Sequence, residues 1–406
     1  MNYFALSEIY LLEVFFGMRK RILLIFTALI ASTALFMSLE IFGTGYENIF
    51  PKCDEKAGII DFSFTPPTVA ARSAIVINAE SGNVIFSHNA DESRGMASTT
   101  KIMTALVAIE NGDIGEEFVI PKEAVGIEGS SVYLKEGERL TLEELLYCLL
   151  LESGNDAATA IALLVGGSVE SFVGMMNTKA EELGLESTHF DNPHGLSSES
   201  HKTTARELAL ITASAMKQPL FRKIVSQKTA FVRYDGRENG RRLVNHNKLL
   251  FGYSGAIGVK TGYTMLDGKC LVSAAERNGI TLIAVTLQDP FPTSTHRKML
   301  DGGFELLEKK SISNGIISQN IPLENGFCEY ITAKSEKEIF LSLPKGAIPD
   351  CELILPQTLS APIKKGEYLG YAKFTLDGEI VYIINLYADE SAEERKKSLF
   401  EILFGE

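Results

Sequence analysis

The feature that most constrains this fold is a serine and a lysine three residues apart, Ser98 and Lys101, at the start of a segment with helical spacing. This offset places both side chains on one face of a helix. A serine hydroxyl becomes a good nucleophile when a neighbouring base takes its proton, and a lysine is that base only while it is neutral. Lowering the lysine pKa from about 10.4 to neutrality costs roughly 4 kcal/mol, which burial and a second cation can supply. The fold must therefore bring another cation to this helix.

Lys260 is the expected second cation. It lies in Lys260-Thr261-Gly262, within a run from Gly258 to Thr261 that is typical of a strand. Gly262 has no side chain, so a substrate can approach the backbone closely there. A strand far along the chain is thus predicted to lie beside the Ser98 helix.

The third element is Ser153-Gly154-Asn155, which lies between two predicted helices where side chains can project into a cleft. Ser153 can relay a proton, and Asn155 can orient Lys101 and a substrate amide. Each of these short motifs also occurs by chance in long chains. The catalytic interpretation depends on all three occurring together, in this order, each on the element that its task requires.

The periodicity around the motifs predicts helices combined with an antiparallel sheet. Strands are expected at 73–78, 84–86, 258–261, 270–274 and 280–287, and helices at 97–109, 141–151, 155–165, 168–183, 205–216 and 296–309. The helix at 141–151 opens with a capping box. From about residue 315 the pattern is β throughout, with a hairpin turn at Asp377-Gly378. We expect residues 315–388 to form a separate small β domain.

Charge and terminal segments indicate the compartment. The formal net charge of −13, with scattered basic residues, argues against nucleic acid as a partner. Arg19-Lys20-Arg21 is followed by an uncharged apolar run from Ile22 to Leu39. This pattern predicts export, with 1–45 as a signal or membrane-anchor segment, cleaved or retained, and 46–68 as a linker. The tail 389–406 is interpreted either as an amphipathic helix at a membrane surface or as a short helix packed on the β domain.

The cysteines suggest neither a metal site nor a disulfide scaffold, because their spacing matches no ligand motif. Cys148 and Cys270 lie in apolar runs and are expected to be buried. A bridge between Cys328 and Cys351 stays open.

Four further residues have alternative interpretations. His189, His194 and His246 lie in polar, Asn-rich stretches, so we expect them to pack in loops rather than to act as catalytic bases. Arg297 either helps to bind a substrate carboxylate or lies on a helix surface.

Taken together, these segments resemble the low-molecular-weight penicillin-binding proteins of the D-alanyl-D-alanine carboxypeptidase family. The resemblance runs from about Ser73 to Ala388, and its matching segments are 96–101, 153–158, 192–196, 245–249 and 258–264. It implies an α+β fold of the penicillin-binding and β-lactamase type, with an antiparallel sheet, helices and an α cluster over 69–312. A small all-β domain, which the β-lactamases lack, would follow.

The resemblance also implies an activity and its residues. The expected enzyme is a serine-type D-Ala-D-Ala carboxypeptidase of cell wall biogenesis, with peptidoglycan pentapeptides as substrate, β-lactams as covalent inhibitors, and no cofactor or metal. It would act at the extracytoplasmic face of the bacterial cell membrane or in the cell wall, and associate with the membrane surface. Ser98 would be the acylated nucleophile, Lys101 the general base and Ser153 the proton relay to the leaving D-alanine. Substrate would be bound by Asn155, Lys260, Thr261 and Gly262, and the oxyanion by the backbone N–H groups of Ser98 and Tyr263.

Two other functions remain open from the sequence. A class A-like β-lactamase would share Ser98, Lys101, Ser153 and Lys260, but it needs an added carboxylate for fast deacylation, and we find no convincing counterpart. A non-catalytic peptidoglycan-binding or sensor protein would keep the fold without hydrolysis.

Overall fold

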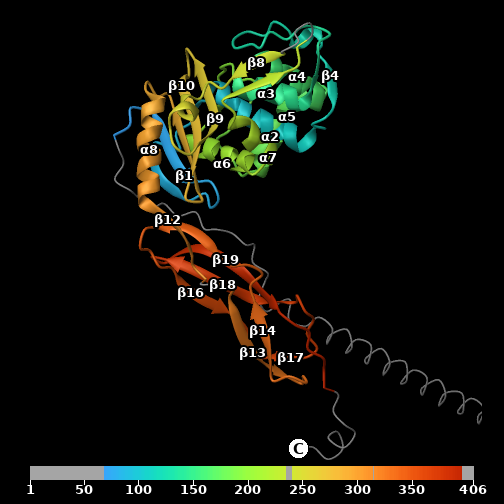
Figure 1. Ribbon diagram of the computed structural model, residues 1–406, viewed down its shortest axis with the longest axis vertical. Coiled ribbons are helices and arrows are strands. Elements are labelled where there is room, and N and C mark those ends of the chain that lie inside the picture. Colours follow the sequence, from blue (N-terminus) through green and yellow to red (C-terminus); the bar gives the residue numbers. More distant parts are fainter. Residues whose placement is uncertain (1–67, 235–239, 314, 396–406) are drawn as a thin grey trace, which may run out of the picture.

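The structure is a computed structural model that describes residues 68–234, 240–313 and 315–395. It comprises an α+β domain and, joined to it through α8, an elongated β domain (Figure 1). The expected signal or anchor segment 1–45, nearly all of the linker 46–68 and residues 396–406 of the tail lie outside the described residues.

A five-stranded antiparallel sheet in the order β2-β1-β11-β10-β9 forms the centre of the first domain. Its strands are β1 Ser73–Asn78, β2 Val84–His88, β9 Ala256–Thr264, β10 Gly268–Arg277 and β11 Ile280–Leu287. Successive side chains of a strand point to opposite faces. Ile75 and Ile77 accordingly pack into the helical core, whereas Ala74 and Val76 pack on the α8 side. Because both faces are covered, β11 is apolar and buried along its whole length.

Helices cover both faces of this sheet (Figure 1). Helix α8, Pro292–Leu306, lies on one face and contributes Met299 and Leu300 to the core there. The other face packs against an α cluster whose members are α2 Lys101–Asn111, α3 Leu142–Leu151, α4 Asn155–Gly166, α5 Val169–Glu182, α6 Ala205–Met216 and α7 Pro219–Val225. The predicted capping box of α3 is confirmed: Thr141 Oγ1 accepts from the Glu144 N–H, and the Glu144 carboxylate accepts from the Thr141 N–H.

Short elements close the loops between these layers. The two-stranded ladders are β3 Arg94–Gly95 with β6 Lys202–Thr203, β4 Glu117–Val119 with β5 Arg139–Thr141, and β7 Thr229–Val232 with β8 Arg241–Val244. The 3-10 turns are η2 Ala97–Thr100, η3 Lys122–Ala124 and η4 Lys248–Phe251. Sequence periodicity missed α7 and the β7–β8 hairpin.

The second domain is all β, as expected, and has its own hydrophobic core. Its main sheet has the order β16-β18-β19-β14-β13-β17, and β12 pairs with β15 beside it. The strands are β12 Leu307–Ser311, β13 Ser318–Glu324, β14 Tyr330–Lys334, β15 Phe340–Pro344, β16 Asp350–Ile354, β17 Leu359–Ser360, β18 Tyr368–Leu376 and β19 Glu379–Ala388. Asp377 and Gly378 join β18 to β19 with positive φ angles, which suit a tight hairpin turn.

The domain boundaries differ from those expected from the sequence. The last helix was expected at 296–309, with the first domain ending at 312 and the β domain spanning 315–388. In the structure α8 ends at Leu306, and residues 307–311 extend as β12 along β15, so the β domain begins at Leu307. At the other end, Ala392 pairs with Ile363 and Glu394 with Gly326, so the first part of the tail belongs to the β domain.

The cysteine predictions have a clear outcome. Cys148 and Cys270 are buried. Cys328 and Cys351 are both free thiols, so the bridge that the sequence left open does not form in this structure.

Candidate active site

Ser98 and Lys101 lie where η2 passes into α2, and β9 runs beside them. The approach is close at Gly262: a Cβ on this residue would lie 3.0 Å from the Ser98 nitrogen and 3.1 Å from the Met96 oxygen. Only a glycine permits this distance without a shift of the backbone. The predicted meeting of the Ser98 helix with the Lys260 strand is therefore present.

The Lys101 side chain is fully buried and ends among three oxygen atoms. Its Nζ lies 3.0 Å from Ser98 Oγ, 2.7 Å from Asn155 Oδ1 and 2.6 Å from the His194 carbonyl oxygen. The two carbonyl-type oxygens can only accept hydrogen bonds. A neutral amine has two N–H bonds and one lone pair, so donation to these two acceptors directs its lone pair at the Ser98 hydroxyl.

Burial and charge favour that neutral amine. Loss of solvation lowers the pKa of Lys101 well below its ordinary value, and the nearby Lys260 charge lowers it further, while Asp156 opposes the change. Burial alone lowers the pKa of Lys260 to about 7. Lys260 Nζ donates to the Thr261 carbonyl at 2.9 Å. The second cation that the chemistry of Lys101 requires is thus supplied by the residue that the sequence indicated.

Asn155, at the start of α4, connects Lys101 to a loop that borders the site. Its amide nitrogen Nδ2 donates to the Glu128 carbonyl at 2.5 Å, and its backbone N–H donates to the Ser130 carbonyl at 2.7 Å. With Nδ2 committed to Glu128, Oδ1 must face Lys101. The hydrogen bond to the Glu128 carbonyl therefore sets the orientation in which Asn155 accepts from Lys101.

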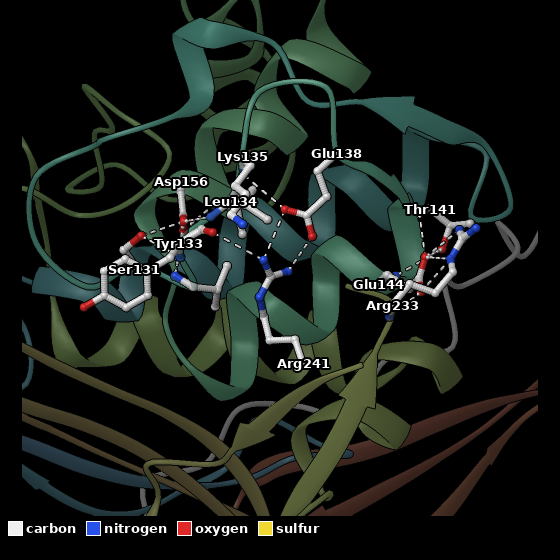
Figure 2. Close-up of polar contacts among 12 residues, drawn as sticks. Ser131, Tyr133, Leu134, Lys135, Glu138, Thr141, Glu144, Asp156, Arg233 and Arg241 are labelled. Carbon is white, nitrogen blue, oxygen red and sulfur yellow. Dashed lines mark hydrogen bonds and ion pairs between the residues drawn. The ribbon is translucent and has the colours of Figure 1, made fainter. Parts of the chain in front are cut away.

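The next residue, Asp156, fixes the same loop from inside the protein. This fully buried carboxylate accepts hydrogen bonds from Ser131 Oγ at 2.6 Å, from the Leu134 N–H at 3.0 Å and from the Val132 N–H at 3.1 Å (Figure 2). Between these anchors Tyr133 has a left-handed φ of 57° and a side chain that is 81% exposed. Asp156 therefore determines the path of the segment that carries Ser130.

A buried ion pair anchors the far side of this loop. Arg241 of β8 contacts Glu138 through both terminal guanidinium nitrogens, at 3.0 and 3.1 Å, and donates to the Tyr133 carbonyl at 3.3 Å (Figure 2). Further along the same hairpin, Arg233 pairs with Glu144 of α3. The β7–β8 hairpin thus holds the loop against the α cluster.

Ser153 lies between α3 and α4 with a left-handed φ of 65°, and its side chain is 4% exposed. The preceding Glu152 accepts from the Val244 N–H at 2.6 Å and pairs with His246 at 3.2 Å. Such a backbone conformation costs about 1 kcal/mol or more for a residue with a Cβ. The contacts of Glu152 keep the strained turn in place and direct Ser153 into the cleft.

The cleft has a volume of about 660 Å³. Ser98, Ser130, Ser153, Thr261, Gly262 and Tyr263 line its catalytic end, and His246, Lys248, Lys269, Cys270, Leu271, Arg297 and residues 290–294 line the rest. No carboxylate side chain is among these lining residues, although the whole chain carries a formal charge of −13. An anionic substrate is therefore favoured over a cationic one.

The structure brings the residues chosen from the sequence together. Lys101 is in direct contact with both Ser98 and Asn155, and Ser153, Thr261, Gly262 and Tyr263 line the cleft with Ser98. Lys260, on the same strand, is buried beneath this surface. Arg297 lines the cleft and lies over the Tyr253 ring at 5.6 Å.

Sequence reasoning missed two participants. The His194 carbonyl is a backbone group, and nothing in a side-chain pattern marks it. Asp156 was detectable as a lone acid at the start of an Ala-rich helix, but its loop partners were not. Among the described residues, no three His, Cys, Asp or Glu side chains are grouped closely enough to hold a metal ion.

Two family models match this chain, one over each domain. The family model for D-alanyl-D-alanine carboxypeptidase matches residues 60–290, and the model for the penicillin-binding protein 5 C-terminal domain matches residues 307–394. The second match begins at the first residue of β12.

Individual relatives match between about three fifths and four fifths of this chain. D-alanyl-D-alanine carboxypeptidase DacF of Bacillus subtilis is 33% identical over 324 residues, which are 77% of this chain and 83% of that protein. A D-alanyl-D-alanine carboxypeptidase of Streptomyces sp. strain K15 is 38% identical over 60% of this chain and 90% of its own length. The crystal structure of penicillin binding protein 5 from Haemophilus influenzae superposes with a TM-score of 0.69 at 27% identity, covering 82% of this chain and 100% of that one.

Proposed function

Because the chain belongs to the D-alanyl-D-alanine carboxypeptidase family and is a serine-type D-Ala-D-Ala carboxypeptidase of peptidoglycan, we propose that Ser98 is the nucleophile that becomes acylated. We also propose that Lys101 is the general base that takes the Ser98 proton. The family match over residues 60–290 includes both of these residues, together with Ser153 and Lys260. Support for the individual roles comes from the distances, burial and charge around Lys101.

One observation carries the proposal: Lys101 Nζ is surrounded by Ser98 Oγ and two oxygens that cannot donate. The neutral amine accepts the Ser98 proton as Oγ attacks the carbonyl carbon of the penultimate D-alanine. The resulting ammonium can donate to all three oxygens. The same acceptors therefore orient the base before proton transfer and stabilise its charged form afterwards.

Electrostatic stabilisation of the oxyanion comes from backbone N–H groups. We assign this role to the N–H groups of Ser98 and Tyr263, with β9 close to η2 at Gly262. Loss of one such donor typically costs about 3–4 kcal/mol of transition-state stabilisation. Since β9 is the edge strand of the sheet, the stem peptide can add to it as a further strand.

Departure of D-alanine requires a proton on its nitrogen. We assign to Ser153 the relay of that proton from Lys101 to the leaving amine, and to Lys260 with Thr261 the binding of the terminal carboxylate. The support is that Ser153 and Thr261 line the cleft with Ser98, and that Lys260 is buried next to Thr261 on the same strand. The resemblance also gives Asn155 a substrate amide as partner, but its Nδ2 is committed to the Glu128 carbonyl and its Oδ1 to Lys101, so we assign to it the orientation of the base. Water then attacks the acyl carbon and gives one proton to Lys101. As the bond from the acyl carbon to Ser98 Oγ breaks, Lys101 passes that proton to Oγ, which restores the neutral amine and the free hydroxyl.

The test combines intact-mass analysis with turnover. The wild type, incubated with a penicillin, is expected to gain one covalent adduct, and Ser98→Ala none. Ser171→Ala, which changes an exposed serine on α5, is the matched control and should react as the wild type does. D-alanine release from a pentapeptide should vanish only in Ser98→Ala. Adduct formation in Ser98→Ala would refute the assignment, and rapid turnover of penicillin would indicate a β-lactamase.

We further propose that the protein is exported and works at the outer face of the membrane. The support is the sequence: the basic cluster and apolar run within 1–45, and the apolar cluster at 399–404. Among the described residues, no single helix is long and apolar enough to cross a membrane; α4 and α5 meet the criteria only as a pair bent by 85°.

Two measurements test this location. N-terminal sequencing of the protein recovered from cell fractions should find it in the membrane or outside the cell, either cut near residue 45 or intact. Recovery of the intact chain from the cytoplasm alone would contradict export. Sedimentation with anionic lipid vesicles should require residues 396–406; equal binding by a chain that ends at Arg395 would contradict a role for the tail.

A further inference from the structure

His201 is a buried titratable residue that the mechanism above does not use. Its side chain is 1% exposed and packs edge-on against the Phe190 ring, with the ring centroids 5.8 Å apart. Its Nδ1 accepts a hydrogen bond from the Asp191 N–H at 3.0 Å. Its Nε2 lies 2.7 Å from Thr100 Oγ1. The imidazole thus joins the loop before α6 to the turn that carries the nucleophile.

The direction of these bonds is set by the donors available. A backbone N–H can only donate, so Nδ1 carries no proton, and in a neutral imidazole the proton must then be on Nε2. Burial lowers the pKa of His201 to about 4, which keeps the ring neutral near pH 7. Nε2–H therefore donates to the Thr100 oxygen, and the Thr100 hydroxyl is left to donate elsewhere.

The Thr100 hydroxyl donates to the Ala97 carbonyl at 2.8 Å. Ala97 has a left-handed φ of 47°, and its own N–H donates to Asp267 Oδ2 at 3.1 Å. Side chains thus hold both sides of this strained residue, Thr100 from the same turn and Asp267 from a distant segment. The Ala97 carbonyl belongs to the same peptide group as the Ser98 N–H, the proposed oxyanion donor.

A peptide group is planar, and its C=O and N–H point in opposite directions. An anchor on the Ala97 oxygen therefore sets the direction of the Ser98 N–H. A hydrogen bond to the carbonyl also polarises the N–H of the same group, and hydrogen bonds in a chain strengthen one another. A series of hydrogen bonds that ends on the Ala97 carbonyl oxygen therefore acts on the oxyanion hole without contacting the substrate.

We propose that His201 and Thr100 are positioning residues for the oxyanion hole: a hydrogen-bond chain from the His201 imidazole through the Thr100 hydroxyl to the Ala97 carbonyl orients and polarises the Ser98 N–H. The inference rests on the proposed acylation of Ser98. It assigns to Thr100 a role in the turnover rate, separate from the roles of its neighbours Ser98 and Lys101.

The test uses Thr100→Val, which keeps the shape of the side chain and removes the hydroxyl, and Thr100→Ser, which keeps the hydroxyl. Thr104→Val is the matched control, because Thr104 is equally buried, lies one turn further along α2 and donates to the Pro193 carbonyl at 2.6 Å. The Thr104 hydrogen bond attaches the loop before α6 to α2, but it does not reach the Ala97 peptide.

The readouts are kcat and KM on a D-Ala-D-Ala peptide, the penicillin acylation rate, and the affinity of a boronic acid that forms a tetrahedral anionic adduct. Thr100→Val should lower kcat and the acylation rate about 10- to 100-fold, because a misdirected Ser98 N–H loses only part of the stabilisation that an oxyanion-hole donor supplies. KM should change less than about threefold. Boronate affinity should fall with kcat, and Thr100→Ser and Thr104→Val should stay near the wild type.

Three outcomes would overturn the proposal: wild-type kcat in Thr100→Val, an equal loss in Thr104→Val, or a change confined to KM. His201→Phe gives a test independent of the folding of Thr100→Val, because it removes the donor and keeps an aromatic ring against Phe190. It should lower kcat in the same direction. Activity of the wild type with none in Ser98→Ala verifies the proposed function separately, so failure of the two ideas can be told apart.

Discussion

Replacement of Asp156 by asparagine tests whether one buried carboxylate fixes the loop at the edge of the cleft. Its Oδ2 accepts from Ser131 Oγ, Val132 N–H and Leu134 N–H, and its Oδ1 accepts from the Ala157 N–H at 2.9 Å. Every partner is a donor. Asparagine retains one acceptor oxygen and replaces the other with an NH2 group that faces a donor.

The magnitude can be worked out from those contacts. The best orientation of the asparagine keeps its oxygen toward the loop and loses the bond to Ala157, and a hydrogen bond to a charged group contributes about 1.5–3 kcal/mol. The three remaining bonds lose their charge assistance and weaken to roughly half. The lower cost of burying a neutral amide offsets part of this loss. We expect a net destabilisation of about 3 kcal/mol, or roughly 6–12 °C in Tm for a domain of this size.

The assay is calorimetric unfolding of the full chain, in which the peptidase-domain transition is the one that shifts after acylation by penicillin. Asp91→Asn is the control: Asp91 makes two bonds to Arg206, but its side chain is 69% exposed. It should cost less than about 1 kcal/mol. A Tm of Asp156→Asn within about 2 °C of the wild type, or an equal fall in Asp91→Asn, would refute the reasoning.

Lys260, Lys101 and Gly195 each give a further prediction. Burial lowers the pKa of Lys260 to about 7, so between pH 7 and 10 the unfolded chain binds a proton that the folded chain lacks. The free energy of unfolding, measured in urea, should therefore rise with pH across this window. Lys260→Met should remove that rise. The lowered pKa of Lys101 predicts that acylation falls about tenfold per pH unit below it, which stopped-flow acylation against pH checks; a flat profile would contradict a neutral base. Gly195→Ala would place a Cβ 2.0 Å from the Ala97 oxygen, at a residue with a φ of +89°. Acylation should therefore be lost, and the free energy of unfolding should fall by about 3 kcal/mol. Acylation at the wild-type rate would contradict the close packing.

Much of the fold was predictable because local patterns agree with tertiary demands. The β18–β19 hairpin, the α3 capping box and the buried strand β11 each carry a signal that does not depend on distant residues. The end of α8 was not predictable. Residues 307–311 form a strand because they pair with β15, which lies far along the chain.

The site divides in the same way. The sequence alone indicated the proposed nucleophile, the proposed base and a second cation near them, because the chemistry of a neutral lysine restricts which residues can surround it. Ser98, Lys101 and Lys260 are recognisable without coordinates.

Only the tertiary structure decided how that lysine is oriented. Two of the three oxygens at Lys101 Nζ come from Asn155 and the His194 carbonyl, and a backbone oxygen leaves no trace in a residue pattern. The same holds for the Ala97 peptide, whose strained conformation depends on Asp267 and Thr100. Side-chain identity fixes which chemistry is available, whereas the direction of backbone groups exists only after distant segments have packed together.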